Sequence, residues 1–398
     1  MTSAKIKSNP DPDLQYRQQT VKANNKTLIT PIKAIDHSKL DSSVEVSRKV
    51  GGLNEFYSGL TRQKIYNHLQ NVDSSLDYSL NSFRRKIRNL DSEMQLCFFE
   101  YKDEGFPDSK EIGFMGDQAY VYSDITPIPM LSDFKDRVSN ISIKKDSKGK
   151  DVKEYSPSES KFNRFIKYLS DVIETIEQKN NKPIMGYIPN YRLFFKELIE
   201  FYVKKGINTF YFDANGSSPM SNQTTLHNLL RELSAQETLE TSFVHMLNHN
   251  YGKPYKDNLI IAAKDILGFG LGIDSLGEKH MQLKLSKELA EKMKKNPDNR
   301  SRLFIKNSYG YIKTSDVKTI KDFYPNDSGV DIEHFLSKTK APYSIQNSFN
   351  MEQLALEAIQ LKNRIGESTP ILPYVEKKKN IKDEDLKILK KFKVKDKK

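Results

Sequence analysis

The stretch from residue 183 to residue 216 constrains the fold most, because it has the pattern strand, helix, strand. Residues 183–188 are a short apolar run closed by a Pro-Asn pair, as a buried strand ends in a loop. Residues 193–205 carry an apolar stripe at helical spacing, and a glycine follows the two lysines that end it. Residues 207–212 form a second apolar run. Two buried strands joined by a crossover helix predict a right-handed βαβ unit in a parallel sheet.

Strand and helix patterns alternate on both sides of this unit. Before it, residues 157–179 start with a helix-capping sequence and carry one apolar face, which predicts a helix. After it, helix, strand, helix and strand are predicted in turn at residues 226–233, 241–247, 258–267 and 303–305. This alternation predicts an α/β fold, either a barrel or an open doubly wound sheet. The length of residues 27–370 favours a TIM (β/α)8-type barrel with insertions and a basic C-terminal tail.

Composition predicts three segments outside this pattern. Residues 1–26 are polar and interrupted by prolines, which predicts a disordered N-terminal segment. Residues 143–156 are charged and small, as in a surface insertion. Residues 371–398 are expected to form a Lys-rich tail.

Three further patterns lie inside the predicted barrel. Prolines exclude residues 125–130 from a central strand, whereas residues 95–101 and 119–122 look like strands. A helix is expected from Asn350 to about residue 365.

The formal net charge of +12 is concentrated at one end of the chain. From Lys377 onward there are 11 lysines and 4 acidic residues. A basic tail suits an anionic partner, with nucleic acid the first candidate, or it serves only as a solvated segment that aids solubility. Cys97 is the only cysteine, so an intramolecular disulfide and a multi-cysteine zinc site are excluded. No apolar run is long enough to span a membrane, and we expect a soluble cytoplasmic protein.

Ligands of parallel α/β folds bind beyond the carboxyl ends of the strands. The loop that begins at Gly186 and the loop Asp213-Ala214-Asn215-Gly216 therefore lie on the predicted functional rim. Asp274 also follows an apolar run, so it is a second candidate for a catalytic carboxylate. For Asp213 and Asp124 the simpler interpretation is an aspartate that caps a turn through backbone amides.

Three other motifs give weaker evidence for a cofactor, a metal or a nucleic-acid contact. The glycines at 268, 270 and 272 do not match a dinucleotide-binding pattern, and no Walker lysine is present, so no cofactor is predicted. His245, His249 and His280 are more consistent with structural or rim roles than with a metal site, and no metal is predicted. Lys306 and Tyr309 share a short segment that could contact phosphate and stack a base, or form an ordinary tyrosine-bearing turn.

Several segments, in order, resemble the queuine/archaeosine tRNA-ribosyltransferase (tRNA-guanine transglycosylase) family. They are LITPIKAI, the stretch from Pro183 to Pro219, SFVHMLNHNYGKP, ILGFGLGIDSLGEKH, RLFIKNSYGYIK and NMEQLALEAIQLKNRI. Together they cover about half of the chain through loose patterns. Two family features are missing, namely the cysteine-rich zinc site and the Asp-Ser-Gly-Gly motif, whose neighbourhood here reads GDQAYVYSDITPIP.

The resemblance implies an enzyme that exchanges guanine for a 7-deazaguanine-type base in tRNA, or in DNA, through an aspartate nucleophile. Asp274 would be the nucleophile, although another alignment puts Gly277 at that position, and Asp124 or Asp117 would be the acid/base. The base pocket would be lined by Gly186, Asp213, Asn215 and Gly216. Nucleic acid would be held by Lys306, Tyr309, Lys377, Lys378 and Lys379.

Two alternatives stay open. The chain could be a barrel that binds nucleic acid or a protein partner without catalysis, or an unrelated TIM-barrel hydrolase or lyase that uses Asp213 and His245. Whether the protein forms a homodimer is also left open by the sequence.

Overall fold

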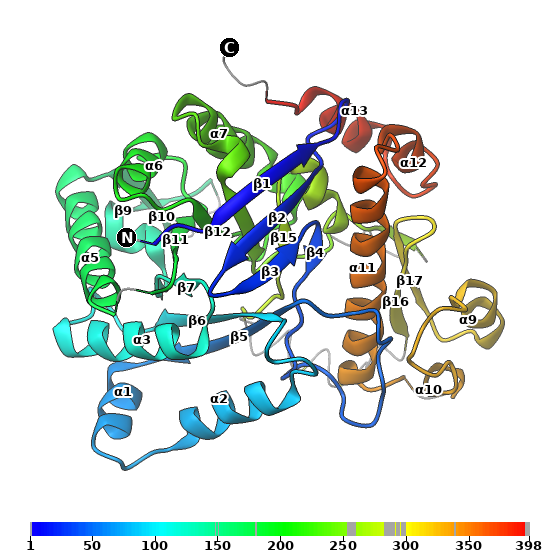
Figure 1. The fold of residues 1–398 in the computed structure, drawn as a ribbon, viewed down its shortest axis with the longest axis horizontal. Coiled ribbons are helices and arrows are strands. Elements are labelled where there is room, and N and C mark those ends of the chain that lie inside the picture. Colours follow the sequence, from blue (N-terminus) through cyan, green and yellow to red (C-terminus); the bar gives the residue numbers. More distant parts are fainter. Residues whose placement is uncertain are drawn as a thin grey trace.

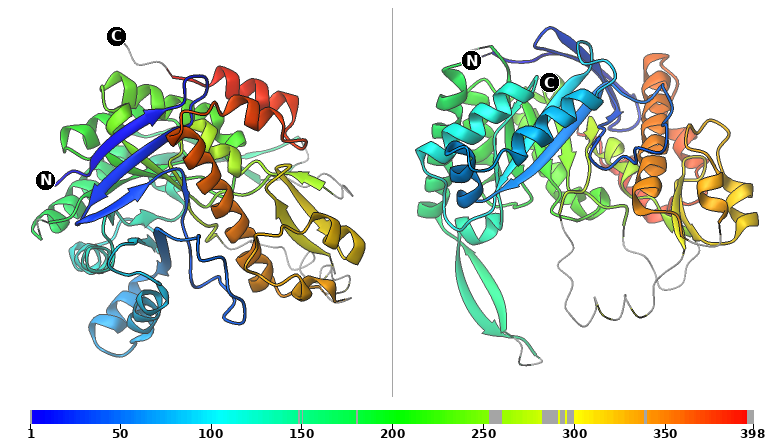
Figure 2. Two further views of the ribbon diagram at one scale, coloured as in Figure 1. Left: turned by 45° about the vertical axis from the view of Figure 1, so that its right-hand side comes forward. Right: turned by 90° about the horizontal axis from the view of Figure 1, so that it is seen from below.

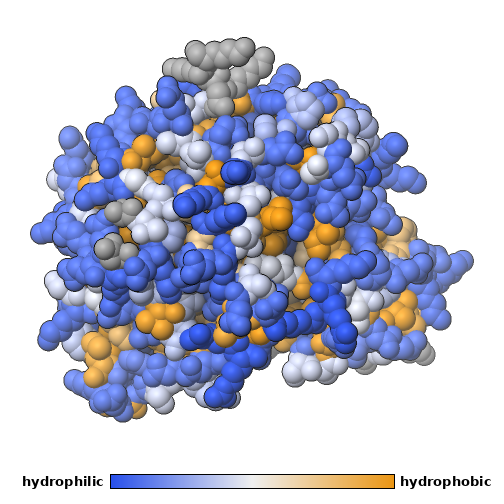
Figure 3. Space-filling view, viewed as in Figure 1, coloured by the Kyte–Doolittle hydropathy of each residue, from blue (hydrophilic) through white to orange (hydrophobic). Residues whose placement is uncertain are grey.

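The computed structural model has a mixed α/β fold in which helices surround parallel strands (Figure 1). It describes residues 2–147, 149, 151–179, 181–252, 260–281, 291, 295, 300–337 and 340–394. Among these residues no helix is long and apolar enough to cross a membrane. The face seen in Figure 3 is mostly hydrophilic, with apolar residues scattered between the polar ones.

The central element is a parallel sheet of six strands. Their spatial order is β4 (Ile32–Lys33), β15 (Ser275–Leu276), β13 (Phe243–Leu247), β12 (Thr209–Asp213), β11 (Ile184–Pro189) and β7 (Thr126–Pro127). Every pair is parallel, with Met185 opposite Thr209 and Thr209 opposite Phe243. The longer strands β11, β12 and β13 are buried on both faces, which explains their mostly apolar sequence.

A second parallel sheet consists of β5 (Leu53–Leu60), β6 (Met94–Tyr101) and β8 (Met130–Leu131). One parallel bridge, between Ile35 and Asn54, connects it to the end of β4. At the other side β7 and β8 belong to one short segment, in which β7 pairs with β11 and β8 pairs with β6. Within the described residues the ladders remain two sheets and do not form one closed ring.

The predicted βαβ unit is confirmed. It consists of β11, the helix α6 (Phe195–Lys204) and β12, which pairs in parallel with β11. The glycine after this helix, Gly206, has φ +70°, the left-handed conformation that ends many helices. The preceding helix α5 (Glu159–Glu177) also matches its prediction and buries one apolar face.

The other helices lie mostly on the outside of the strands (Figure 1). They are α1 (Arg62–Leu69), α2 (Ser75–Lys86), α3 (Ser109–Tyr122), α4 (Phe134–Val138), α7 (Gln223–Ala235), α9 (Val317–Phe323), α10 (Glu333–Leu336) and α11 (Tyr343–Gly366), with the 3-10 helices η1 (Pro219–Asn222), η2 (Leu239–Thr241) and η3 (Ile266–Leu271).

The N-terminal segment is ordered, contrary to the composition-based prediction. It forms an antiparallel sheet of β1 (Lys5–Pro10), β2 (Arg17–Ala23) and β3 (Lys26–Ile29). From β2 the side chain of Arg17 reaches Asp274, at the amino end of β15, through bonds of 2.7 and 2.8 Å. Asp274 also accepts the backbone N–H of Val244 at 2.7 Å. This buried ion pair joins the N-terminal sheet to the amino ends of the parallel strands.

The basic C-terminal segment is also largely folded. It contains α12 (Leu372–Glu376) and α13 (Asp383–Lys391), and the side chains of Leu389 and Phe392 are buried. A separate antiparallel sheet consists of β14 (Ile260–Ala262), which lies between β13 and β15 in sequence, with β17 (Gly310–Thr314) and β16 (Ser301–Ile305), which follow β15. The predicted strand at 303–305 is therefore confirmed, whereas the predicted helix at 258–267 is a strand over its first described residues.

Two local predictions were wrong for identifiable reasons. Residues 119–122 end helix α3, whose Asp108–Glu111 capping box outweighs their strand preference. Helix α11 starts at Tyr343, well before the predicted cap at Asn350, whose side chain instead bonds the backbone of β16. The exclusion of residues 125–130 from a central strand is confirmed, because β7 and β8 are two-residue strands at the edges of their sheets.

The predicted surface insertion forms a hairpin of β9 (Ser139–Lys145) and β10 (Asp151–Pro157). It projects away from the body of the protein (Figure 2). Almost all of its residues are exposed, including the apolar Ile143 at 70%.

We predict that Arg17→Met lowers the free energy of unfolding by about 3–5 kcal/mol, because it leaves the Asp274 carboxylate buried without its partner. Urea denaturation measures the change. The control Lys144→Met removes the exposed ion pair with Glu154 and should cost less than about 1 kcal/mol. Equal midpoints for the two variants would contradict a structural role for the buried pair.

Candidate active site at the carboxyl ends of the strands

Polar side chains converge where the parallel strands end. Asp213 is the last residue of β12, Asn248 follows β13, and His280 follows β15. Glu100 lies near the end of β6, and Glu55 projects from β5 beside the end of β4. Because carboxyl ends of parallel strands share one edge, Asp213, Asn248, His280 and Glu100 lie there. Glu55 lies in the amino half of β5 and joins them through its contacts with His280 and the Glu278 amide.

Asp213 is held in place by two N–H donors. Its Oδ1 accepts from Asn248 Nδ2 at 2.9 Å and from the backbone N of Asn215 at 3.0 Å. Its Oδ2 accepts no hydrogen bond within the described part of the chain. Loss of surrounding water raises the pKa of Asp213, although both donors oppose the rise. The residue thus offers one free carboxylate oxygen in a poorly solvated place.

Glu55 lies between two imidazoles. Its Oε1 is 3.0 Å from His280 Nε2 and accepts the backbone N–H of Glu278 at 2.6 Å, while its Oε2 is 3.3 Å from His245 Nε2. Burial alone would raise the pKa of Glu55, but the hydrogen bonds and charges of His245 and His280 hold it well below its usual range. Burial lowers the pKa of His245, against the effect of Glu55. An ionised carboxylate flanked by two imidazoles is therefore built into the interior.

Aromatic rings fix both histidines. Tyr57 stacks on His280 with the ring centroids 4.4 Å apart, and Phe98 stacks on His245 at 5.3 Å. His245 Nδ1 is 2.7 Å from Ser275 Oγ. The rings exclude water and limit rotation, so the imidazole nitrogens keep a defined direction.

Glu100 is the second carboxylate with a raised pKa. It contacts the Tyr57 hydroxyl and the Lys102 ammonium through the same oxygen, Oε2. Burial raises the pKa of Glu100 although Lys102 opposes it, and the charge of Asp213 adds to the rise. Glu100 thus lies within range of the charge of Asp213.

A chain of hydrogen bonds unites the cluster. Asn248 donates to Asp213 and accepts the backbone N–H of His280 at 2.9 Å, and His280 in turn contacts Glu55. The backbone of His280 is thus linked to the Asp213 carboxylate through Asn248, while its imidazole contacts Glu55.

The Gly277 carbonyl precedes the Glu278 amide that binds Glu55, and it accepts two side-chain hydrogen bonds. The donors are Lys33 Nζ at 3.0 Å and His249 Nε2 at 2.8 Å. The bond to a carbonyl requires the N–H form at His249 Nε2, which leaves its buried Nδ1 as an acceptor without a partner among the described residues. Burial lowers the pKa of His249 to about 4.

Among the described residues no group of three or more His, Cys, Asp or Glu side chains is arranged to hold a metal ion.

The three carboxylates predicted from the sequence as catalytic do not meet. Asp274 is fully buried at the amino end of its strand, where burial raises its pKa and Arg17 opposes the rise. Asp124 lies before β7, also at the amino end, and bonds Lys26, Asn24 and the backbone of Gln95. Asp117 is on the surface of α3 and pairs with Lys179.

The predicted base-binding residues divide into two groups. Asp213, Asn215 and Gly216 lie together at the carboxyl edge, where Gly216 donates its N–H to the Asn248 carbonyl at 2.7 Å. Gly186 lies elsewhere, at the contact between β11 and α6. A Cβ at Gly186 would come within 3.2 Å of the Tyr202 ring, so this glycine allows close packing of helix on sheet.

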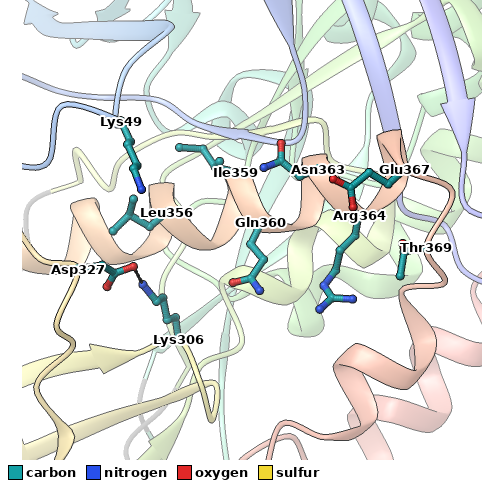
Figure 4. A pocket seen from close by; sticks show the side chains of 10 residues that line it. All are labelled: Lys49, Lys306, Asp327, Leu356, Ile359, Gln360, Asn363, Arg364, Glu367 and Thr369. Atoms are coloured by element: carbon teal, nitrogen blue, oxygen red, sulfur yellow. Dashed lines mark hydrogen bonds and ion pairs between the residues drawn. The ribbon is translucent and has the colours of Figure 1, made fainter.

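The predicted nucleic-acid contacts lie beside helix α11. Lys306 lines a shallow cavity of about 430 Å³ with Lys49 and Arg364 (Figure 4). Tyr309 is fully buried and donates to Glu357, so it cannot stack a base. Lys378 is buried against the same glutamate, whereas Lys377 and Lys379 are exposed.

Sequence reasoning missed Glu55, Glu100 and Asn248. Glu55 and Glu100 lie within strands, so no chain break marks them, but each is an acidic residue in a strand that is otherwise uncharged and largely buried. A charge in a buried strand is costly without a function or a partner, and that signal could have identified both.

No protein-family model and no curated protein matches the chain. Solved structures give remote likenesses only. The carboxyl transferase domain of Rhizobium etli pyruvate carboxylase matches with a TM-score of 0.36 and 11% identity, over 78% of this chain and 42% of that one. A FabK variant from Thermotoga maritima matches with a TM-score of 0.30 and 8% identity, over 74% and 82%.

A third likeness is the enoyl reductase domain of MlnA from Bacillus amyloliquefaciens, with a TM-score of 0.24 and 7% identity, over 85% of this chain and 80% of that one. This chain thus spans less than half of the carboxyl transferase chain. Similarity scores at this level assign neither an activity nor site residues to this chain.

We predict that Gly277→Ala disrupts the Glu55–His245 contact. The added Cβ would lie 2.7 Å from His245 Nε2 and closer still to Glu55 Oε2. Overpacking of this kind typically costs about 1–3 kcal/mol, measurable by urea denaturation. Gly113→Ala is the matched control, since a Cβ at this helical position meets nothing within 4 Å and should not destabilise. Equal stability of the two variants would mean that the cluster tolerates expansion.

We predict a pH-dependent contribution from His249. Its folded-state pKa of about 4 lies below the unfolded value of about 6.5, so the unfolded chain binds more protons between these values. Its contribution is therefore fully present above pH 6.5 and is lost as the pH falls towards 4, by up to about 3 kcal/mol.

The measurement is the difference in unfolding free energy between the wild type and His249→Asn across this pH range. A difference is needed because Asp265, whose pKa burial raises to about 6, titrates in the same range with the opposite sign. A difference that does not change with pH would show that His249 does not titrate as proposed.

Proposed function

We propose that the chain is a glycosyl-transfer enzyme that exchanges a purine base in nucleic acid through an aspartate nucleophile, with Asp213 in that role. The observation that carries the proposal is Asp213, which lies at the carboxyl end of β12 with one oxygen free of hydrogen bonds among the described residues, together with a second carboxylate, Glu100, near the carboxyl end of β6. The guanine substrate, the 7-deazaguanine-type replacement and tRNA, ahead of DNA, as the polymer come from the family resemblance of the sequence.

We further propose that the two sheets are parts of a TIM (β/α)8-type barrel. The spatial order of the six-stranded sheet follows the chain backwards from β15 to β7, and β4 lies beside β15. The bridge from Ile35 to Asn54 and the shared segment of β7 and β8 supply the links between the sheets. In such barrels the catalytic groups occupy the carboxyl edge, where the cluster lies.

The surroundings of the two carboxylates support different roles. The free Oδ2 of Asp213 can attack the anomeric carbon, while the amides on Oδ1 hold the group in position. Burial favours the protonated form of Glu100 that an acid catalyst needs, although the Lys102 ammonium opposes it. The same ammonium, paired with Glu100, supplies positive charge beside the developing negative charge.

The exchange then has two balanced halves. The Asp213 carboxylate bonds to the anomeric carbon, the bond from that carbon to the base breaks, and the base leaves with a proton from Glu100. An incoming base returns its proton to Glu100, attacks the same carbon and releases the carboxylate. One acid/base thus serves both directions of the proton transfer.

We predict that Asp213→Asn reduces base exchange by at least about 1,000-fold, because the amide keeps the acceptor oxygen but cannot attack the anomeric carbon. The assay is incorporation of radiolabelled guanine or 7-deazaguanine into bulk tRNA and, in parallel, into duplex DNA. Glu174→Gln, on the exposed side of α5, is the matched control and should keep full activity.

Asp274→Asn separates this assignment from the one implied by the sequence. If Asp213 is the nucleophile, Asp274→Asn loses stability but the folded fraction still exchanges base. Exchange that survives in Asp213→Asn would remove this residue from the mechanism. Binding of nucleic acid without any exchange by the wild type would favour a non-catalytic binding protein.

A further inference from the structure

The hairpin of β9 and β10 presents apolar side chains to solvent. It lies between α4 and α5 in sequence and projects away from the body of the protein (Figure 2). Four of the thirteen exposed large apolar side chains among the described residues lie on it, namely Ile141, Ile143, Val152 and Tyr155. Such a concentration on one projecting element indicates an interaction surface rather than the usual scatter of single apolar residues.

The hairpin is also incomplete as a sheet. Among the described residues its two strands pair only with each other, and every residue of β9 after Ser139 is exposed. A two-stranded hairpin is at best marginally stable in water, and its edges offer unpaired backbone groups to a further strand. A strand added beside the hairpin would therefore stabilise it.

The edge formed by β9 suits a further strand better than the edge formed by β10. β10 ends in Pro157, which has no N–H to donate, and carries Glu154 at its centre. A second copy of β10 paired on that edge would set two glutamates directly opposite each other, which is destabilising. β9 contains no proline, and its central residue is the uncharged Ser142.

The sequence of β9, SNISIKK, is complementary to a second copy of itself. In an antiparallel pair centred on Ser142, each Ile141 lies opposite Ile143 of the other copy, and each Lys144 lies opposite an asparagine. No like charges meet, and the isoleucines of both copies come together on one face. A pair centred on Ile143 would instead set each Ile141 against Lys145, so the register centred on Ser142 is favoured.

We propose that the edge of β9 pairs with the same edge of a second copy of this chain, so that the two hairpins form one four-stranded antiparallel sheet. The same patch is used by both subunits, which gives a closed dimer with two-fold symmetry. Because the paired strands are antiparallel, the two bodies lie at opposite ends of the shared sheet. The proposal is independent of the proposed function.

Sedimentation velocity of the full chain, from about 1 to about 100 µM protein, tests the proposal. The wild type should pass from monomer to dimer over this range, because an interface made by two hairpins is small and therefore weak. Ser142→Lys sets like charges opposite each other at the two-fold centre and should weaken dimerisation at least about 10-fold. Within its own hairpin the introduced lysine faces Glu154, so the monomer should stay folded.

The matched control is Ser156→Lys, the same substitution on the same face of the hairpin but on β10. Ser156 is exposed and lies away from the proposed contact. This variant should dimerise as the wild type does, and urea denaturation should show both variants to be folded. Equal weakening by the two substitutions, or no weakening by Ser142→Lys, would overturn the proposal.

A charge-pairing experiment tests the register. Ser142→Asp, combined with Glu154→Gln to remove the neighbouring charge, should be monomeric alone, as should Ser142→Lys. A mixture of the two proteins sets opposite charges at the two-fold centre and should recover the dimer. A mixture that stays monomeric would contradict the pairing. A wild type that remains monomeric up to about 100 µM would overturn the proposal and leave the apolar face for a different partner.

Discussion

The candidate site depends on one buried carboxylate, Glu55, that stays ionised between two imidazoles. Taking this charge out of water is costly, and the cost is offset only because His280, His245 and the Glu278 amide all point at it. These donors come from β13 and from the segment after β15, whereas Glu55 comes from β5. The same contacts that satisfy the charge therefore join the two parallel sheets at their carboxyl edge.

Local patterns were sufficient to predict the βαβ unit at residues 183–213. Its helix and strands have distinct periods, and its boundaries carry a proline and a glycine. The N-terminal sheet could not be predicted in the same way. Its strands are polar and short, and they are stabilised by pairing with each other and by long-range contacts such as Arg17–Asp274. Such contacts link positions 257 residues apart and leave no local signal.

The candidate site was predicted only in part, for a related reason. Asp213 follows an apolar run directly, so strand-end reasoning was able to identify it. The same reasoning selected Asp274, but this aspartate precedes its strand, which places it at the opposite edge. The sequence does not show which apolar run is the strand and which is the turn before it. For residues 266–273 the apolar run is mostly the 3-10 helix η3.

The two aspartates also differ in how fully their oxygens are satisfied. Both oxygens of Asp274 accept hydrogen bonds, from Arg17 and from the Val244 amide, which leaves no capacity for a ligand. Asp213 has one free oxygen.

The carboxyl edge also holds one buried atom, His249 Nδ1, without a hydrogen bond among the described residues. Glu55 Oε2 and His245 Nε2, by contrast, face each other at 3.3 Å as an ion pair. Buried polar groups are normally satisfied, but Gln19 Oε1 and Glu357 Oε2 are further exceptions among the described residues, away from this edge. An unsatisfied buried atom therefore does not identify a site in this fold, and the assignment depends on the free oxygen of Asp213.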